Sequence, residues 1–222
     1  MAIDGKKNGT LKKWVSLSLA GAGVAGGSAA FADIITVDVN QTYNFGDTPI
    51  TLDLPGINDM RVSSTSAIFS RSVALAGATG ATYFQVRRFT AGTFSGGTRK
   101  MLQPASAGQT FNSGAGTVGS FGLLGATDTT FGPIGTGPYA SQFFLFRFAD
   151  STDGGQVNYG WLQASLLAVG SPSTVTVQIE RYAYDTSGAP LTIPEPTTLG
   201  MGALMLGAMG IRRWRQAKRN AA

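Results

Sequence analysis

The middle of the chain is a series of short runs in which apolar and polar residues alternate, and this pattern constrains the fold most strongly. Ile35, Val37 and Val39 alternate with Thr36 and Asp38, so a strand here places its apolar side chains on one face. Clusters of Gly, Ser, Asn, Asp and Pro separate the runs, and none of the runs keeps a helical period. Further strands are predicted at 50–54, 60–64, 67–74, 82–89, 121–124, 142–148, 159–167 and 174–184.

Many short strands without helices between them indicate an all-β fold. We expect an antiparallel β-sandwich or jelly roll over residues 33–193, a stretch long enough for one domain with its own core. Between Thr90 and Gly137 glycines are frequent and the alternation is weak. Long loops with one or two strands are expected there, and helices are expected only at the two ends of the chain.

The chain contains neither histidine nor cysteine. Histidine is the usual general base and the commonest transition-metal ligand, and cysteine supplies thiolate nucleophiles and metal ligands. The formal net charge is +5, but residues 33–193 contain 8 basic against 10 acidic side chains, so the positive charge belongs to the ends. We therefore expect no Ser-His-Asp or thiol chemistry and no nucleic-acid partner.

Residues 1–32 have the parts of a secretory signal peptide. Lysines before residue 14 precede an apolar run from Trp14 to Val24, and small residues follow. Small side chains at Ala30 and Ala32 fit the pockets of signal peptidase, so cleavage is expected between Ala32 and Asp33. The secretion translocon and signal peptidase are thus expected partners, with an uncleaved amphipathic helix as the alternative.

Residues 194–222 form a second segment of three parts. These are the motif Pro194-Glu195-Pro196, an apolar run from Leu199 to Ile211, and the basic residues Arg212, Arg213 and Arg215. A transmembrane helix over 197–214, with its last residues reaching the headgroups, comes close to spanning a bilayer. Basic residues follow the run and none directly precedes it, so the C-terminal end is expected to stay in the cytoplasm. A soluble core helix is the alternative.

This three-part arrangement resembles the PEP-CTERM sorting signal of Gram-negative bacteria, which the Pro-Glu-Pro motif and the three arginines match. The resemblance covers residues 194–222. It implies recognition by an exosortase, a membrane-embedded, transpeptidase-like processing enzyme. It also implies a transient stage in the inner membrane and then release to the cell surface or medium, usually in bacteria that make an exopolysaccharide matrix.

Residues 143–193 resemble the ectodomain of many PEP-CTERM proteins. In that ectodomain a Tyr-Gly-Trp strand, here Tyr159 to Trp161, precedes a Tyr-Ala-Tyr strand, here Tyr182 to Tyr184, just ahead of the sorting signal. Family members often carry histidine before Tyr-Gly-Trp, whereas this chain has Asn158. Any role of that histidine is therefore missing here.

Two acidic turns are weak candidates for metal sites. Asp53, Asn58 and Asp59 resemble the calcium-loop-like segment near the start of related ectodomains, but a proline stands where a further oxygen donor is expected. Asp150 and Asp153 do not have the spacing of an EF-hand loop. Turns containing Pro or Gly are the favoured interpretation at both places, so we expect no metal and no cofactor.

Four aromatic residues, Tyr159, Trp161, Tyr182 and Tyr184, are spaced by two along their strands. Such residues lie on one face of a sheet and are weak candidates for a platform that stacks against sugar rings. The same pattern also serves a buried core, because Trp and Tyr bury large apolar areas, and core packing is favoured. Exposure of Trp161 or Tyr182 would support sugar binding, and burial of both would count against it.

Together these features favour a non-enzymatic exported protein of the cell surface or extracellular matrix, associated with exopolysaccharide and without catalytic residues. A carbohydrate-binding module and an uncleaved protein anchored in the membrane by its C-terminal helix are the alternatives. A hydrolase that uses only Asp and Glu is disfavoured, because Glu180 is the only glutamate between residues 33 and 193 and a carboxylate pair is not apparent.

Overall fold

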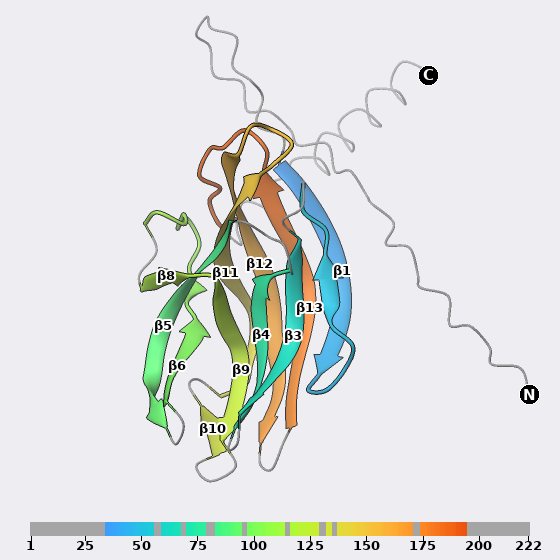
Figure 1. The fold of residues 1–222 in the computed structure, drawn as a ribbon, viewed down its shortest axis with the longest axis vertical. Coiled ribbons are helices and arrows are strands. Elements are labelled where there is room, and N and C mark those ends of the chain that lie inside the picture. Colours follow the sequence, from blue (N-terminus) through green and yellow to red (C-terminus); the bar gives the residue numbers. More distant parts are fainter. Residues whose placement is uncertain are drawn as a thin grey trace, which may run out of the picture.

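The computed structural model describes residues 34–55, 59–67, 70–78, 83–94, 97–113, 116–128, 132–134, 137–170 and 174–194. In these ranges every regular element is a strand (Figure 1). The strands are β1 (Ile34–Asn44), β2 (Ile50–Leu52), β3 (Met60–Ala67), β4 (Ser70–Gly77), β5 (Phe84–Phe94), β6 (Gly97–Leu102), β7 (Pro104–Ala105), β8 (Thr117–Gly119), β9 (Phe121–Asp128), β10 (Gly132–Ile134), β11 (Tyr139–Asp150), β12 (Gln156–Gly170) and β13 (Thr174–Asp185).

The strands join into one nearly closed, barrel-like sheet. Their order is β1-β13-β12-β11-β5-β6-β9-β4-β3-β2, with β7, β8 and β10 paired to β11, β5 and β9. All pairs are antiparallel except β6 and β9, which meet in parallel at Met101 and Leu123. The prediction of an all-β body is confirmed. The pairing is continuous, however, where a sandwich was expected to have two separate sheets, and it includes one parallel contact.

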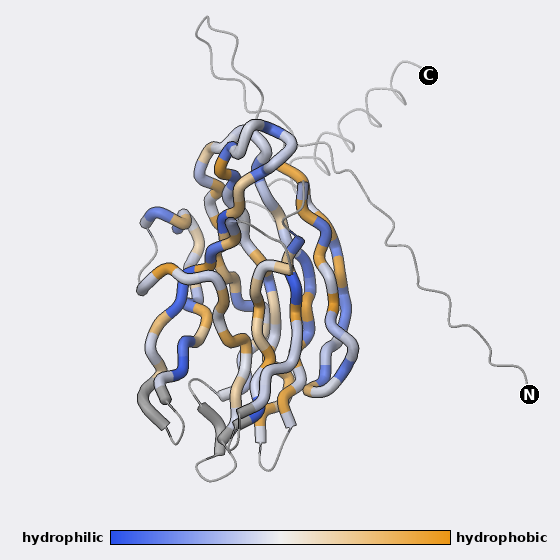
Figure 2. The backbone as a smooth tube through the Cα atoms, in the orientation of Figure 1, coloured by the Kyte–Doolittle hydropathy of each residue, from blue (hydrophilic) through white to orange (hydrophobic). Residues whose placement is uncertain are grey.

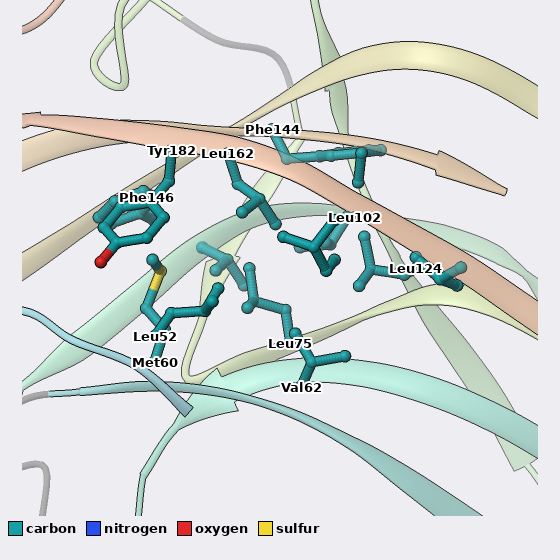
Figure 3. Close-up of a cluster of buried hydrophobic side chains, with 14 of the residues drawn as sticks. Leu52, Met60, Val62, Leu75, Leu102, Leu124, Phe144, Phe146, Leu162 and Tyr182 are labelled. Carbon is teal, nitrogen blue, oxygen red and sulfur yellow. The ribbon is translucent and has the colours of Figure 1, made fainter. Parts of the chain in front are cut away.

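The main core lies inside this wrapped sheet. Figure 3 shows side chains from β11, β12 and β13 pointing toward side chains from β2, β3 and β4. Leu52, Val62, Phe146 and Leu162 are fully buried there, and each such side chain stabilises the fold by about 1.5–3 kcal/mol. Hydrophobic and hydrophilic residues alternate along the strands, as the sequence predicts (Figure 2).

The nine predicted strands coincide with β1–β5, β9 and β11–β13. Between residues 90 and 137, where long loops with one or two strands were expected, the structure has the five strands β6, β7, β8, β9 and β10, of which only β9 was predicted. Glycines hide them. A Cβ on Gly125 of β9 would come within 2.6 Å of Leu166 Cδ1. This glycine therefore belongs to a strand against which the core packs too closely for a side chain. Very short strands and such glycines leave no alternating pattern to detect.

A second apolar cluster lies on the outer face of β11–β13, beneath residues 191–194, which we call the strap. Leu191 and Ile193 of the strap are buried together with Trp161. Two backbone hydrogen bonds hold the strap in place, from Ile193 N to Gln109 O (3.1 Å) and from Gly108 N to Ile193 O (3.0 Å). The sheet is thus covered on this face by the end of the described chain.

Candidate functional site

The four aromatic candidates do not form a platform. Trp161 is 5% exposed and Tyr182 is 2% exposed, Tyr184 is buried, and Tyr159 is half-buried. Tyr182 and Tyr184 belong to the main core, whereas Tyr159 and Trp161 belong to the cluster beneath the strap. Core packing, the favoured interpretation, is therefore confirmed, and these rings cannot stack together on a sugar.

Burial also determines the protonation of the core tyrosines. The Tyr182 hydroxyl donates a hydrogen bond to the Asp53 carbonyl oxygen (2.7 Å). Desolvation raises the pKa of Tyr182 well above its ordinary value, and the neighbouring Tyr184 adds to this effect. Burial likewise raises the pKa of Tyr139, whose hydroxyl donates to the Leu124 carbonyl oxygen (2.9 Å). These hydroxyls act as neutral structural donors.

The acidic turns are held by local hydrogen bonds. Asp59 Oδ1 accepts a hydrogen bond from the backbone N–H of Leu54 (3.1 Å), while Asn58 lies outside the described residues. Asp150 Oδ1 accepts hydrogen bonds from the backbone N–H and the hydroxyl of Thr152 (2.8 and 2.6 Å). Within the described ranges, no three His, Cys, Asp or Glu side chains gather where they could hold a metal ion.

The turn between β11 and β12 has the geometry that its sequence predicts. Gly154 and Gly155 have φ values of 61° and 84°, in the left-handed region that glycine adopts without strain. Gly155 N donates to the Asp150 carbonyl oxygen (2.9 Å). Asp150 is therefore occupied in closing a hairpin.

Glu180 lies where two serine hydroxyls converge. Ser165 Oγ donates to Glu180 Oε1 at 2.6 Å, and Ser141 Oγ donates to the same oxygen at 2.9 Å. Ser141 has a φ of 49°, an uncommon conformation for a residue other than glycine. In the described part of the chain no hydrogen bond or ion pair joins Glu180 to a second carboxylate or to a base. The arrangement does not supply the carboxylate pair of a glycosidase.

The predicted processing residues lie almost entirely outside the described ranges. Pro194 is the last described residue and is half-buried. Residues that fall outside are Ala30, Ala32, Asp33, Glu195, Pro196, Arg212, Arg213 and Arg215. Among the residues that are described, no helix has the length and apolar character needed to cross a membrane.

Sequence reasoning missed an open groove of about 560 Å³, lined by residues of β3 and β4, by the start of β5 and by the residues around the start of β9. Its polar lining comes from Ser63, Thr65, Gln85 and Ser120, and its aromatic lining includes Tyr83 and Phe121. Among the described residues that line it, none is an acid, a lysine or an arginine. Hydroxyl and amide groups beside aromatic rings suit the binding of a polar, hydroxyl-rich ligand.

Guanidinium groups stand beside two aromatic rings of this groove, those of Tyr83 and Phe121. Arg147 lies 5.5 Å from the Tyr83 ring centre, and its Nε and Nη2 donate to Gln85 Oε1 at 2.8 and 2.6 Å. Arg88 lies 5.4 Å from the ring centre of Phe121, which is 44% exposed. Cation–π contact and hydrogen bonds thus orient two positive charges next to the groove.

The guanidinium group of Arg87 lies next to that of Arg147. Arg87 and Arg147 both lie against the ring of Phe111, at 5.5 and 4.9 Å from its centre. Desolvation lowers the pKa of Arg87, and the positive charge of Arg147 lowers it further. The adjacent Arg87 and Arg88 are visible in the sequence, but the meeting of Arg87 with Arg147 depends on the pairing of β5 with β11, where Gln85 is opposite Arg147.

Comparison of the chain with models of known protein families, with curated proteins and with solved structures finds no match in any of the three. The function of the groove is therefore inferred from its own residues.

Proposed function

We propose that the protein is a non-enzymatic exported protein of the cell surface or extracellular matrix, and that its body binds matrix polysaccharide in the groove between β4 and β5. The observation that carries this proposal is the lining of the groove, where Ser63, Thr65, Gln85 and Ser120 accompany the aromatic residues Tyr83, Phe84 and Phe121. Sugars are recognised by this combination, because ring faces stack on apolar surface while hydroxyls exchange hydrogen bonds.

Export is supported by the two ends of the chain. The signal peptide at 1–32 and the tail at 194–222, which resembles the PEP-CTERM sorting signal, are expected to flank the all-β body as a signal helix and a transmembrane helix. In this proposal the tail holds the protein briefly in the inner membrane, with its C-terminus in the cytoplasm, until an exosortase processes it. The body then reaches the cell surface or the medium.

Mass-spectrometric mapping of the termini tests the route. Protein is recovered from the inner membrane, from the cell surface and from the medium of the producing bacterium. A surface form that starts at Asp33 and ends near Pro194 supports both processing steps. A surface or membrane form that retains residues 199–215 contradicts processing and leaves the second candidate, a protein anchored permanently by its C-terminal helix.

Binding is tested with polysaccharide isolated from the same bacterium. We expect the purified full chain to be retarded in affinity electrophoresis, and Phe121→Ala to remove most of this retardation. The control is Leu167→Ala, because Leu167 is also an exposed apolar residue, 50% exposed, but lies on β12 outside the lining of the groove. An equal effect of both variants, or no retardation of the parent chain, would contradict the proposed binding.

A further inference from the structure

We propose that the groove takes an acidic polysaccharide, and that Arg87 and Arg147, which we call the arginine pair, bind a carboxylate of its uronic acid units. The inference rests on the proposed function, since it names the class of polysaccharide that the groove recognises. Its basis is the placement of two guanidinium groups on one aromatic ring, beside the residues that line the groove.

The arginine pair has positive charge that its surroundings leave uncompensated. No ion pair involves Arg87 or Arg147 in the described part of the chain. Asp150 of β11 and Asp185 of β13 are acids on the paired strands, and their Oδ1 atoms accept hydrogen bonds in their own turns from Thr152 and Ser187. Asp185 is separated from Arg147 by the intervening strand β12, which corresponds to about 10 Å. Two like charges held together repel each other, so a bound anion would stabilise the pair.

The pair also has hydrogen-bond donors to spare. Arg147 gives its Nε and one N–H of Nη2 to Gln85 Oε1. Arg87 gives one long hydrogen bond, from Nη1 to the Gly116 carbonyl oxygen at 3.3 Å, and its Nε is buried without a partner. A guanidinium has five N–H donors, and the flat fork that they form fits the two oxygens of a carboxylate. The unused donors are those that such an anion requires.

Covering the Phe111 ring is the simpler role for these side chains, because long arginines often lie over apolar surface. That role needs one guanidinium and does not need a second cation beside it. It also does not account for the link to the groove, since Gln85 and Tyr83, which hold Arg147, are themselves lining residues.

A third cation favours a ligand with repeated charges. Arg88 stacks on Phe121 and donates from Nη1 to the carbonyl oxygen of the same residue at 3.3 Å. The groove therefore has a guanidinium beside Tyr83 and another beside Phe121. A chain of uronic acid units carries a carboxylate on each ring, which combines the flat anion with hydroxyls for the polar lining.

The test uses an oligogalacturonate and the same oligosaccharide after reduction of its carboxyl groups. Binding to the purified full chain in mild detergent is measured by isothermal titration calorimetry. We expect the charged ligand to bind at least about tenfold more tightly than the reduced one, as for hydrogen bonds to charged groups, and the difference to shrink in high salt.

Arg87→Gln and Arg147→Gln should each weaken binding of the charged ligand by about tenfold or more. Arg147→Lys keeps the positive charge but lacks the planar set of N–H donors, so its affinity for the charged ligand should lie between those of the glutamine variants and that of the parent chain. Arg181→Gln is the matched control, because Arg181 donates its Nε to a glutamine oxygen, Gln163 Oε1 (2.6 Å), just as Arg147 donates to Gln85, yet Gln163, unlike Gln85, does not line the groove. Its affinity should stay within about twofold of the parent. Thermal unfolding of every variant checks that it is folded.

The outcomes separate the two proposals. Equal binding of the charged and reduced ligands, unaffected by the arginine variants, would overturn the carboxylate inference and leave a groove for neutral polysaccharide. Binding of neither ligand would overturn the inference and count against the proposed function too. Equal losses in the Arg181 control, or equal affinity for single-stranded DNA of the same charge, would show unspecific attraction of polyanions and would also overturn it.

Discussion

Gly160, in the first half of β12, is expected to tolerate no side chain. It lies opposite Phe146 of β11 and Tyr184 of β13. A Cβ at this position would come within 2.4 Å of Phe146 Cζ and within 2.5 Å of the Ala183 carbonyl oxygen, whereas ordinary contacts begin at 3.4 Å. Phe146 is fully buried and the Ala183 carbonyl is part of the neighbouring strand. Neither clash can be relieved by turning an exposed side chain.

The cost follows from these contacts. Overpacking a core costs about 1–3 kcal/mol, and because one of the two clashes involves backbone we expect Gly160→Ala to lower the free energy of unfolding by about 3 kcal/mol. The control is Gly170→Ala at the end of the same strand, where a Cβ would meet nothing within 4 Å. This change should alter the free energy of unfolding by about 0.5 kcal/mol or less.

Urea unfolding followed by tryptophan fluorescence measures both variants, with the midpoint and the slope fitted separately. A loss below about 1 kcal/mol for Gly160→Ala, at an unchanged slope, would show that the paired strands move apart enough to accept a methyl group. Equal losses in both variants would show that the flexibility of glycine matters more than space. Either result would refute the reasoning from contact distances.

Three further predictions concern buried hydroxyls and the cluster beneath the strap. Burial raises the pKa of Tyr139 and Tyr182 above the ordinary value of 10.0, so the unfolded chain releases these protons first as the pH rises. The stability that the two residues contribute is complete below about pH 10 and should then fall by about 1.4 kcal/mol per pH unit for each tyrosine; a flat profile in urea unfolding at alkaline pH would contradict this. Tyr43→Phe removes a buried hydroxyl that accepts a hydrogen bond from Ser64 N (2.8 Å), and thermal unfolding should report a loss of about 1–2 kcal/mol; an unchanged stability would contradict the importance of this hydrogen bond. Trp161→Ala should lower the free energy of unfolding by about 3–5 kcal/mol in the same assay, and a binding defect without this loss would assign the ring to a ligand instead.

The sequence predicts most of the strands because their alternation records which face is buried. In β13, Val175, Val177 and Ile179 are all buried, as their spacing indicates. The prediction stopped short where burial does not alternate, as in β9, of which only residues 121–124 were expected although the strand runs to Asp128 and its Gly125 packs directly against Leu166. A glycine read alone indicates a loop, and only the neighbouring layer shows that it is needed in a strand.

The candidate site was much less predictable than the fold. The four aromatic residues were correctly favoured as core, because their period of two matches a buried face. The groove and the arginine pair could not be found in the same way. Arg87 and Arg147 come together only through the pairing of β5 with β11, and Phe111, the ring that they share, lies in a loop whose course over the sheet has no signature in the sequence.

The strap leaves only a short connection between the body and the apolar run of the tail. Its last bonded residue, Ile193, is followed by only five residues, 194–198, before the apolar run begins at Leu199. Extended backbone covers about 3.5 Å per residue, so this connection reaches about 17 Å at most. At the proposed membrane-held stage, the end of the body that carries the strap would stand directly over the lipid headgroups. A processing enzyme would have to enter that narrow gap, and cleavage there would free the body with every hydrogen bond of the strap intact.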